Sequence, residues 1–451
     1  MKTTLIKSAM ATLAIVATVS FTSCSKDEET ETPMTPDSKN IVQVAKSDNQ
    51  FSTLVAAIEK AGLASTLEST GPFTVFAPTN AAFDALFSQL GVSGLSDLSA
   101  ETLKPILLNH VLAGSVKSSA INTGYFATAN TYGPNMESVN VYIQKGSGVK
   151  VDGSNVTSAD IMASNGVIHV IDKVILPSSV VGHALNNADF SILVQAVVKA
   201  GLADVLSGTG PFTVFAPTNT AFNALFNQLG VSGISDLSAD VLKPILLNHV
   251  VSGAVKSSAI TTGYFATVNA SGPNSTAVKV YIQKGSGVTV DGSNVIAADI
   301  MGSNGVIHVI DKVILPASVV SHAINNPNFS ILVQAVVKAG LVEALSGTGP
   351  FTVFAPTNDA FNALFATLGV SGIDALTAEQ LTPILLYHVV SGNVTASQVA
   401  TGSVPTLKDG SNISIVAGSS GVKLNNSSNV IATDVQGTNG VIHAIDAVLL
   451  P

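Results

Sequence analysis

The chain of 451 residues has no arginine and no tryptophan, and it has a single cysteine. All 20 basic residues are lysines, so the bidentate guanidinium contacts that recognise phosphate and carboxylate groups are missing. Together with a net charge of −9, this makes nucleic acid a poor partner. One cysteine cannot form a disulfide within the chain, and the lack of tryptophan leaves a stacking platform for sugars poorly supplied.

The first 23 residues have the features of a secretory signal. Lys2 and Lys7 precede the apolar stretch ATLAIVATVS, which is too short to span a bilayer permanently, and FTSC follows. The sequence before Cys24 resembles a bacterial lipoprotein cleavage box, which predicts a signal peptide over residues 1–23 and acyl chains on Cys24. Those acyl chains would anchor the protein in a membrane. An ordinary signal peptide with an incidental cysteine is the alternative.

Residues 24–39 are interpreted as the lipidated cysteine followed by a disordered, acidic tether. The stretch SKDEETETPMTPDSKN is charged, is rich in Thr and Pro, and has little to bury. Its acidic start resembles the export signal that sends some Gram-negative lipoproteins to the outer cell face, and a generic solvated spacer is the alternative. We therefore expect an outer-membrane lipoprotein that faces the cell exterior, with the periplasmic face as the alternative.

One stretch of ten residues occurs three times at a fixed spacing. GPFTVFAPTN begins at residues 71, 210 and 349, so both offsets are 139. A period of this length allows each copy to bury its own core, unlike the shorter period of solenoid repeats. Landmarks at both ends of the copies place three domains at 40–177, 178–316 and 317–451, and the third has lost four residues internally. The short connections between them favour a semi-rigid rod.

The recurring stretch predicts a strand followed by a corner and a helix. Alternation along the strand places Val75 and Phe76 on opposite faces. The residue before Pro78 is biased away from helix, and Thr79 or Asn80 can then cap a new helix. This corner joins the sheet of each copy to its helical layer.

Helices precede most of the strands in each copy. FSTLVAAIEKAGL carries one apolar helical stripe, and LTAEQLTPILLYHVV contains a capping box of Thr377 and Gln380, with Pro383 where a following helix could begin. Short strands separated by turns come next, as in VNVYIQKGSGVKVDGSNV, where Val139, Val141 and Ile143 alternate onto one face. The fold class is therefore α+β.

Three ordered motifs in each copy resemble the fasciclin domain. They are TVFAPTN followed by AF, then LLNHV or LLYHV, and finally NGVIHVID or NGVIHAID before LP. The resemblance covers residues 40–451 and implies three tandem fasciclin-like domains, each a wedge-shaped β-sandwich with several small helices. Proteins of this family are found at cell surfaces or are secreted, and they are generally associated with adhesion to cells or matrix.

Candidate binding residues come from two places. In animal matrix members of the family a Tyr-His pair is tied to integrin binding, and only Tyr387 and His388 keep that pair here, because the other two copies have Asn109 and Asn248 before the histidine. Aromatic residues in the polar TGYF segments form a second candidate surface: Tyr125, Phe126, Tyr264 and Phe265. The alternative is that these aromatics fold back over the edge of the sandwich.

No catalytic, cofactor or metal site is expected. His169 and Asp172 lie three apart on a predicted strand, so they point to opposite faces and cannot hold one ion together. His110 and its equivalents are interpreted as buried residues with a backbone partner. The chain has no GxSxG motif, P-loop or dinucleotide fingerprint, and DGSN at residues 152–155 is interpreted as a hairpin turn because it lacks the acidic oxygens of a calcium loop.

The leading hypothesis is a cell-surface adhesion lipoprotein that binds an extracellular protein or polysaccharide. Three similar domains would add weak contacts into avidity. The alternative is a structural spacer, or a self-associating envelope or matrix protein, without a specific ligand. A small-molecule receptor or an enzyme would need a polar pocket, which the sequence does not indicate.

Overall fold

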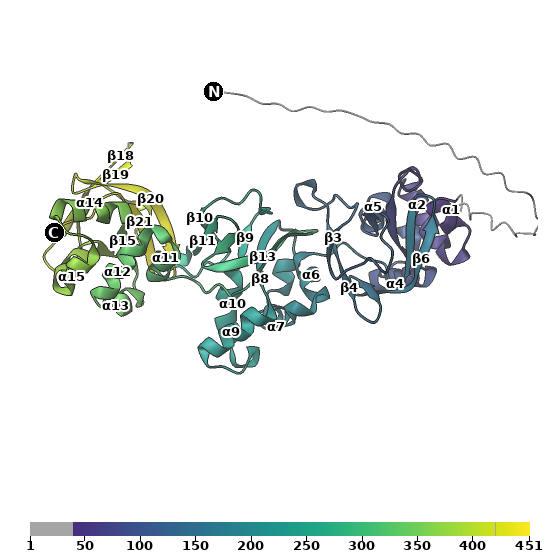
Figure 1. The fold of residues 1–451 in the computed structure, drawn as a ribbon, viewed down its shortest axis with the longest axis horizontal. Coiled ribbons are helices and arrows are strands. Elements are labelled where there is room, and N and C mark those ends of the chain that lie inside the picture. Colours follow the sequence, from purple (N-terminus) through teal and green to yellow (C-terminus); the bar gives the residue numbers. More distant parts are fainter. Residues whose placement is uncertain (1–38, 420) are drawn as a thin grey trace, which may run out of the picture.

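A computed structural model describes residues 39–419 and 421–451. The predicted signal peptide, Cys24 and nearly all of the predicted tether lie outside these residues. Three domains follow one another along the long axis of the molecule (Figure 1). Within the described part of the chain, no helix is long and apolar enough to cross a membrane.

The first domain begins with helices and ends with strands. Its α-helices are α1 (Ile41–Lys46), α2 (Ser52–Lys60), α3 (Ala64–Leu67), α4 (Asn80–Leu90) and α5 (Ala100–Leu108). Its 3-10 helices are η1 (Asn49–Phe51), η2 (Leu95–Asp97) and η3 (Pro134–Met136). Its strands are β1 (Phe73–Pro78), β2 (Val111–Ala113), β3 (Gly124–Ala127), β4 (Asn140–Lys145), β5 (Val149–Val151), β6 (Ser154–Ala163) and β7 (Gly166–Ile171).

The second domain repeats this order of elements. Its α-helices are α6 (Val180–Asn186), α7 (Ser191–Lys199), α8 (Ala203–Ser207), α9 (Asn219–Leu229) and α10 (Ala239–Leu247). Its 3-10 helices are η4 (Ala188–Phe190), η5 (Ile234–Asp236) and η6 (Pro273–Ser275). Its strands are β8 (Phe212–Pro217), β9 (Val250–Ser252), β10 (Gly263–Ala266), β11 (Lys279–Lys284), β12 (Val288–Val290), β13 (Ser293–Gly302) and β14 (Gly305–Ile310).

The third domain differs mainly in its loops. Its α-helices are α11 (Val319–Asn325), α12 (Ser330–Lys338), α13 (Val342–Ser346), α14 (Asn358–Leu368) and α15 (Ala378–Tyr387). Its 3-10 helices are η7 (Pro327–Phe329), η8 (Ile373–Ala375) and η9 (Ala396–Gln398). Its strands are β15 (Phe351–Pro356), β16 (Val389–Ser391), β17 (Gly402–Pro405), β18 (Asn412–Gly418), β19 (Gly421–Leu424), β20 (Ser428–Gly437) and β21 (Gly440–Ile445).

Each domain contains one sheet of seven strands. In the first domain the order is β2-β1-β7-β6-β5-β4-β3, with β1 and β7 parallel and the other neighbours antiparallel. Two register shifts in the pairing of β6 with β7, between Val156 and Ile161, bend the sheet. A bridge between Leu112 and Thr128 links the two ends of the strand order, so the sheet is nearly closed.

Two apolar cores in each domain follow from this curved sheet. Val75 of β1 packs in the cluster beneath the helices, together with Leu54 of α2. Phe76, on the opposite face of the same strand, packs with Ile143 and Val151 between the two halves of the sheet. The alternation expected for the recurring strand is therefore confirmed, and so is the sandwich with several small helices.

The corner after β1 is capped by the first of its two candidate residues. Thr79 is the N-cap of α4, and its hydroxyl accepts a hydrogen bond from the backbone N–H of Ala82 at 3.3 Å. Asn80 is the first helical residue instead. Its side chain accepts from Thr53 N–H and donates to the Asn49 carbonyl, which ties α4 to the start of α2.

The expectation that a helix begins at Pro383 was wrong. The predicted capping box is present, with Gln380 N–H bonded to the Thr377 hydroxyl and Thr377 N–H bonded to the Gln380 side chain, and it starts one helix that continues through Pro383. Proline costs this helix one backbone hydrogen bond. The helix persists because its apolar face, with Leu381 and Leu385, is buried.

The third domain is shorter between its first two sandwich strands. The paired residues Ala127 and Asn140 are 140 − 127 = 13 positions apart, whereas Pro405 and Asn412 are 412 − 405 = 7 apart. The next two turns are each one residue longer than in the first domain. Six residues lost and two gained account for the net loss of four that the repeat spacing indicated.

Candidate functional site

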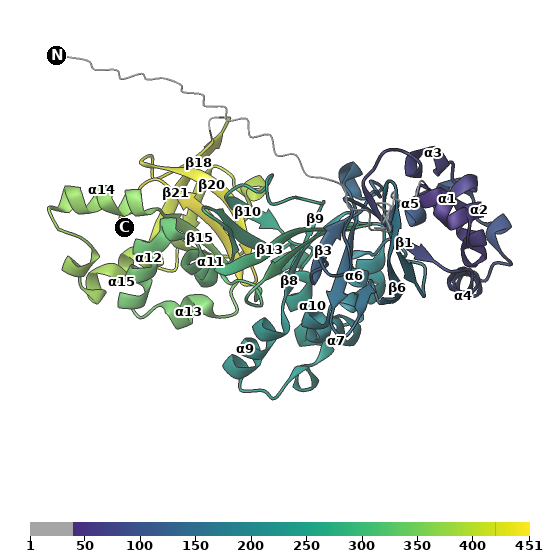
Figure 2. The same cartoon turned by 45° about the vertical axis from the view of Figure 1, so that its right-hand side comes forward.

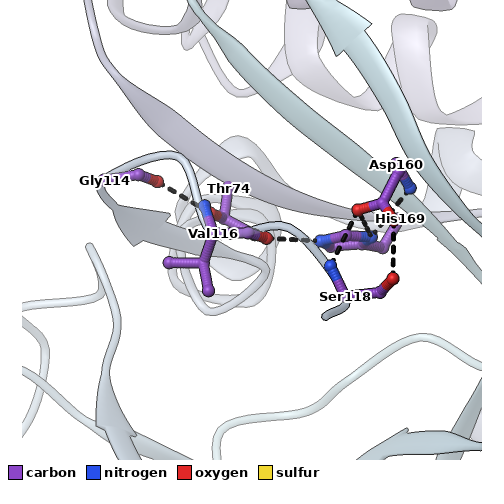
Figure 3. Close-up of polar contacts among 6 residues, drawn as sticks. All are labelled: Thr74, Gly114, Val116, Ser118, Asp160 and His169. Atoms are coloured by element: carbon purple, nitrogen blue, oxygen red, sulfur yellow. Dashed lines mark hydrogen bonds and ion pairs between the residues drawn. The ribbon is translucent and has the colours of Figure 1, made fainter. Parts of the chain in front are cut away.

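A cluster of serine, aspartate and histidine side chains lies where β6, β7 and the segment after β2 meet (Figure 3). The Ser118 hydroxyl donates to Asp160 Oδ2 at 2.5 Å, and Ser118 N–H donates to Asp160 Oδ1 at 2.7 Å. His169 Nδ1 accepts from Asp160 N–H at 3.2 Å, and its Nε2 donates to the Val116 carbonyl at 2.9 Å. The Thr74 hydroxyl extends the network by accepting from Val116 N–H at 2.9 Å.

The connectivity of this cluster differs from that of a catalytic triad. In a triad the serine hydroxyl is hydrogen-bonded to the imidazole that takes its proton. Here Ser118 donates to Asp160, and both nitrogens of the buried His169 are bonded to backbone groups. In the third domain Ala396 takes the place of the serine, and its N–H donates to Asp434 Oδ1 at 2.7 Å. The cluster therefore holds the segment after β2 against the sheet.

The histidine at the end of α5 also has a structural environment. His110 is 2% exposed, its Nδ1 donates to the Ile106 carbonyl at 2.8 Å, and its Nε2 accepts from Ile175 N–H at 2.9 Å. Burial lowers the pKa of His110 to about 4, so the imidazole is neutral at pH 7. His249 and His388 make the same two bonds. The expected buried histidine with a backbone partner is confirmed.

The predicted binding pair, Tyr387 and His388, belongs to the interior of the third domain. Tyr387 is 5% exposed, and its hydroxyl donates to the Asn412 carbonyl and accepts from Asn425 Nδ2, both at 2.8 Å. His388 is 2% exposed and is bonded to Ile384 and Leu449 of the same domain. Neither side chain offers an accessible surface in this structure, so a binding role for this pair stays a prediction.

The predicted contact surface at Tyr125 and Phe126 lies at the junction of the first two domains. Tyr125 is on β3, and its ring meets the ring of His183 from α6 edge-on at 5.5 Å between centroids. Its hydroxyl accepts from Asn187 Nδ2 at 3.2 Å, and the Tyr142 ring lies on its other side at 4.8 Å. Phe126 packs with the sandwich core of its own domain. Both views place β3 beside α6 (Figure 1, Figure 2).

The second junction repeats the first. Tyr264 meets the ring of His322 at 5.6 Å, and its hydroxyl accepts from Asn326 Nδ2 at 3.1 Å. The Tyr281 ring stacks behind it at 4.9 Å, while Phe265 packs into the sandwich core of the second domain. The two tyrosines therefore bind the next domain of the same chain, and an external partner for these four aromatics stays a prediction.

A buried carboxyl group lies at each junction. Asp152 Oδ1 accepts from Tyr142 N–H at 2.8 Å, and its Oδ2 accepts from the Ser178 hydroxyl at the start of the next domain at 3.2 Å. Burial raises the pKa of Asp152 to about 6. Asp291 accepts from Tyr281 N–H at 2.9 Å, and burial raises its pKa to about 7.

The junctions are features that the sequence analysis missed. Further bonds cross the first one, including Met301 N–H to Asn140 Oδ1 at 2.7 Å and an ion pair between Lys256 and Glu137 at 3.0 Å. A signal was present, because TGYF occurs in the two copies that are followed by another copy, whereas the third copy has TGSV at residues 401–404. The presence of the tyrosine and phenylalanine only in copies that precede another copy indicates a contact between domains.

The second and third domains each contain an apolar pocket, which the sequence analysis also missed. The pocket under α6 and α7 has a volume of ≈ 110 Å³, and the one under α11 and α12 has ≈ 120 Å³. Both pockets are lined almost entirely by apolar side chains. They therefore differ from the polar pocket that a small-molecule receptor or an enzyme would need. In residues 39–419 and 421–451, no group of three or more His, Cys, Asp or Glu side chains could hold a metal ion.

Comparison with known proteins gives relatives over almost the whole described chain. The ig-h3 protein of Sus scrofa, named transforming growth factor-beta-induced, is 32% identical over 91% of this chain and 58% of its own length. Human periostin is 29% identical over 91% of this chain and 47% of its own length. The chain thus spans about half the length of these relatives. The Synechocystis protein sll1483 is 49% identical over 30% of this chain and 73% of its own length.

A solved structure and a family model add to these relatives. The structure is a FAS1 domain pair from the insect cell adhesion molecule Fasciclin I, with 23% identity, a TM-score of 0.37, and coverage of 57% of this chain and 95% of its own. The family model, described as the fasciclin domain, matches residues 49–177, 188–316 and 327–451. These three matches account for most of the chain, and each contains all seven strands of one domain. The chain therefore belongs to the fasciclin family.

Proposed function

We propose that this protein is a surface adhesion protein that binds an extracellular protein or polysaccharide through its fasciclin domains. The observation that carries the proposal is the arrangement of three domains of one family in a row, joined by two ordered junctions (Figure 1). A rigid row of similar domains presents similar surfaces at fixed spacing, which suits a repetitive partner and adds affinity through multivalency. Lipid on Cys24 would hold this row at the outer membrane, facing the cell exterior.

Stabilisation of the domain is a better account of the polar cluster than catalysis. In Figure 3 the Ser118 hydroxyl is bonded to the Asp160 carboxylate, and both ring nitrogens of His169 are bonded to backbone groups, so the imidazole is not placed to take the proton of the hydroxyl. The third domain keeps the fold of this region with alanine in place of serine. We therefore assign the cluster to stability of the domain.

A structural spacer is the second candidate, and the ordered junctions favour it. They would keep a membrane anchor and a distal domain at a set distance without any ligand. Self-association through the same junction is less supported, because the third domain has Ser403 and Ser414 where the others have the paired tyrosines, and the first domain has Val44 where the others have the contacting histidine.

Binding of residues 25–451 to arrays of extracellular proteins and of bacterial and host polysaccharides tests the proposal. We expect saturable binding to one class of partner. No binding across the arrays, together with self-association in sedimentation velocity, would instead support the structural role. The anchor is tested separately with the full-length chain, in which Cys24→Ala should release the protein from the membrane fraction while Ser25→Ala should not.

A further inference from the structure

The apolar pocket of the second domain opens to solvent between two helices. Its floor includes Val214 and Phe215 of β8, and its walls are apolar side chains of α6 and α7. Leu185 of α6 and Val198 of α7 lie at its mouth and are 63% and 64% exposed. Exposed large apolar side chains on both sides of a cavity are typical of a site that binds an apolar group.

The third domain repeats the pocket with different side chains at the mouth. Ile324 of α11 and Val337 of α12 occupy the same positions, at 324 − 185 = 139 and 337 − 198 = 139 residues along the chain, and each is 60% exposed. Leucine has been replaced by isoleucine, yet the apolar character is kept. The pocket therefore occurs in two domains and is not a local irregularity of one of them.

The lining of these pockets offers no free hydrogen-bonding side chain. Among the described residues that line each pocket, the only polar side chain is the histidine at the helix end, His249 or His388, and both of its nitrogens are bonded to backbone groups. A peptide segment entering the pocket would lose the hydrogen bonds that its N–H and C=O groups make to water and would gain none. A hydrocarbon group has no such bonds to lose, so the lining fits a hydrocarbon.

The first domain has charged side chains at the same place. Lys46 and Glu59 stand at the two mouth positions and form an ion pair at 3.0 Å. Beneath them Ile58, 3% exposed, replaces the smaller Val197 and Val336, each 8% exposed. The first domain therefore has a charged mouth and a larger side chain beneath it at the positions that are apolar and smaller in the other two domains.

We propose that the second and third domains, and not the first, each bind one hydrocarbon chain of a small lipid-like molecule. A cavity of about this size, with an apolar lining, accepts a group about as large as benzene. The rest of the chain lies along the exposed mouth residues, and the polar end of the molecule stays in water. The proposal is independent of adhesion, since it concerns a pocket inside single domains and needs no extracellular protein or polysaccharide.

The occupant is a single dispersed molecule and not a bilayer surface. The pocket is recessed below a mouth two side chains wide, and no lysine lines it to attract anionic headgroups. An apolar helix of a partner protein could place one side chain there, and this possibility is an outcome of the test below.

The test uses the uncharged fluorescent probe N-phenyl-1-naphthylamine with residues 25–451. The chain has no tryptophan, so the intrinsic fluorescence background is low. We expect saturable binding of two probes per chain, displaced by dodecanol and not by phosphatidylcholine vesicles or by an apolar helical peptide. Absence of saturable binding by the unaltered chain, or displacement by the vesicles or the peptide alone, would overturn the proposal.

Variants that copy the first domain supply the decisive control. Leu185→Lys with Val198→Glu in the second domain, and Ile324→Lys with Val337→Glu in the third, introduce the ion pair that the first domain already carries. We expect one probe site to remain after either pair is changed and none after both, with affinity of a changed site lowered about tenfold or more. Circular dichroism checks that each variant stays folded, and unchanged stoichiometry in a folded quadruple variant would contradict the proposal.

The reverse exchange should create a site. Lys46→Leu, Ile58→Val and Glu59→Val together give the first domain the mouth and the floor space of the other two. The number of probes bound should rise from two to three. A folded variant that still binds two would show that the mouth residues do not control binding.

Discussion

At the scale of single residues, the buried histidines act as neutral hydrogen-bonding groups. Burial lowers the pKa of five of them to about 4: His110, His183, His249, His322 and His388. An unfolded chain would protonate them near pH 6.5, so their contribution to stability is complete above that pH and is lost as the pH falls toward 4. For each of these histidines, the free energy of unfolding should fall by on the order of 2 kcal/mol between pH 7.5 and pH 5.

Two buried carboxyls have the opposite dependence. The pKa of Asp152 is raised to about 6 and that of Asp291 to about 7, above the usual value of 3.8. The folded chain therefore holds these protons more tightly than the unfolded chain, and stability decreases as the pH rises from about 4 through the raised values. In the third domain an amide stands in the place of these two carboxyls, because Asn425 Oδ1 accepts the equivalent hydrogen bond from Ser414 N–H at 2.9 Å.

Acidification from pH 7.5 to 5 should therefore destabilise the third domain most and the first domain least. The third contains His322 and His388 without an opposing acid, whereas in the first Asp152 offsets His110. Hydrogen–deuterium exchange followed by mass spectrometry measures this domain by domain, after correction for the intrinsic exchange rates. Equal losses in the three domains would contradict the prediction.

An aspartate variant provides the control for the pH prediction. Asp152→Asn removes the opposing contribution, so the first domain should become more sensitive to acid. The exposed Asp84→Asn should leave the sensitivity unchanged.

At the scale of elements, helix starts are set by local hydrogen bonds while helix continuation is set by packing. The helix that contains Pro383 starts at the capping box of Thr377 and passes through the proline because its apolar face is buried. The sequence signals for where helices begin were reliable because a helix cap depends on residues only three apart in the chain. The signal for a new start at Pro383 was misleading, because burial of Leu381 and Leu385 comes from distant parts of the chain.

Thr377→Ala should lower the free energy of unfolding of the third domain by about 1 kcal/mol, because Gln380 N–H loses its capping partner. Thr377→Ser should cost little, since Ser99 and Ser238 cap the equivalent helices of the other domains. Thermal unfolding of the two variants, followed by calorimetry, makes the comparison. If alanine and serine cost the same, the cap does not stabilise this helix as described.

At the scale of the whole molecule, two junctions turn three domains into a row. Each junction places a tyrosine of one sheet against a histidine and an asparagine of the next domain's first helical segment. The third domain has Ser403 opposite Ser414 where the tyrosine pairs stand in the other two. The serines retain the strand pairing, so the sheet does not require tyrosines at these positions, whereas the tyrosines of the other two domains contact the next domain.

Replacing Tyr125 with serine should loosen the first junction without unfolding either domain. The change removes the ring contact with His183 and the bond from Asn187, and both of these contacts have counterparts at the second junction. Small-angle X-ray scattering should then show a broader distribution of interdomain distances. Tyr264→Ser should act in the same way on the second junction.

The exposed Tyr132→Ser serves as the matched control, because its side chain is 54% exposed. It should leave the scattering profile unchanged. An unchanged profile for Tyr125→Ser as well would mean that the remaining contacts, such as the ion pair of Lys256 with Glu137, hold the junction alone.

The amino-acid sequence by itself determined the repeat, the fold class and the family, because these depend on periodicity and on short motifs that are local. It also predicted the strand-to-helix corner at Thr79 and the burial of His110, since both follow from neighbours in the chain. Only the tertiary structure decided which aromatics meet another domain and where apolar side chains leave a pocket open. Both depend on residues far apart in sequence, such as Tyr125 with His183 at the junction and Leu185 with Val250 in the pocket lining, that come together only when the chain is folded.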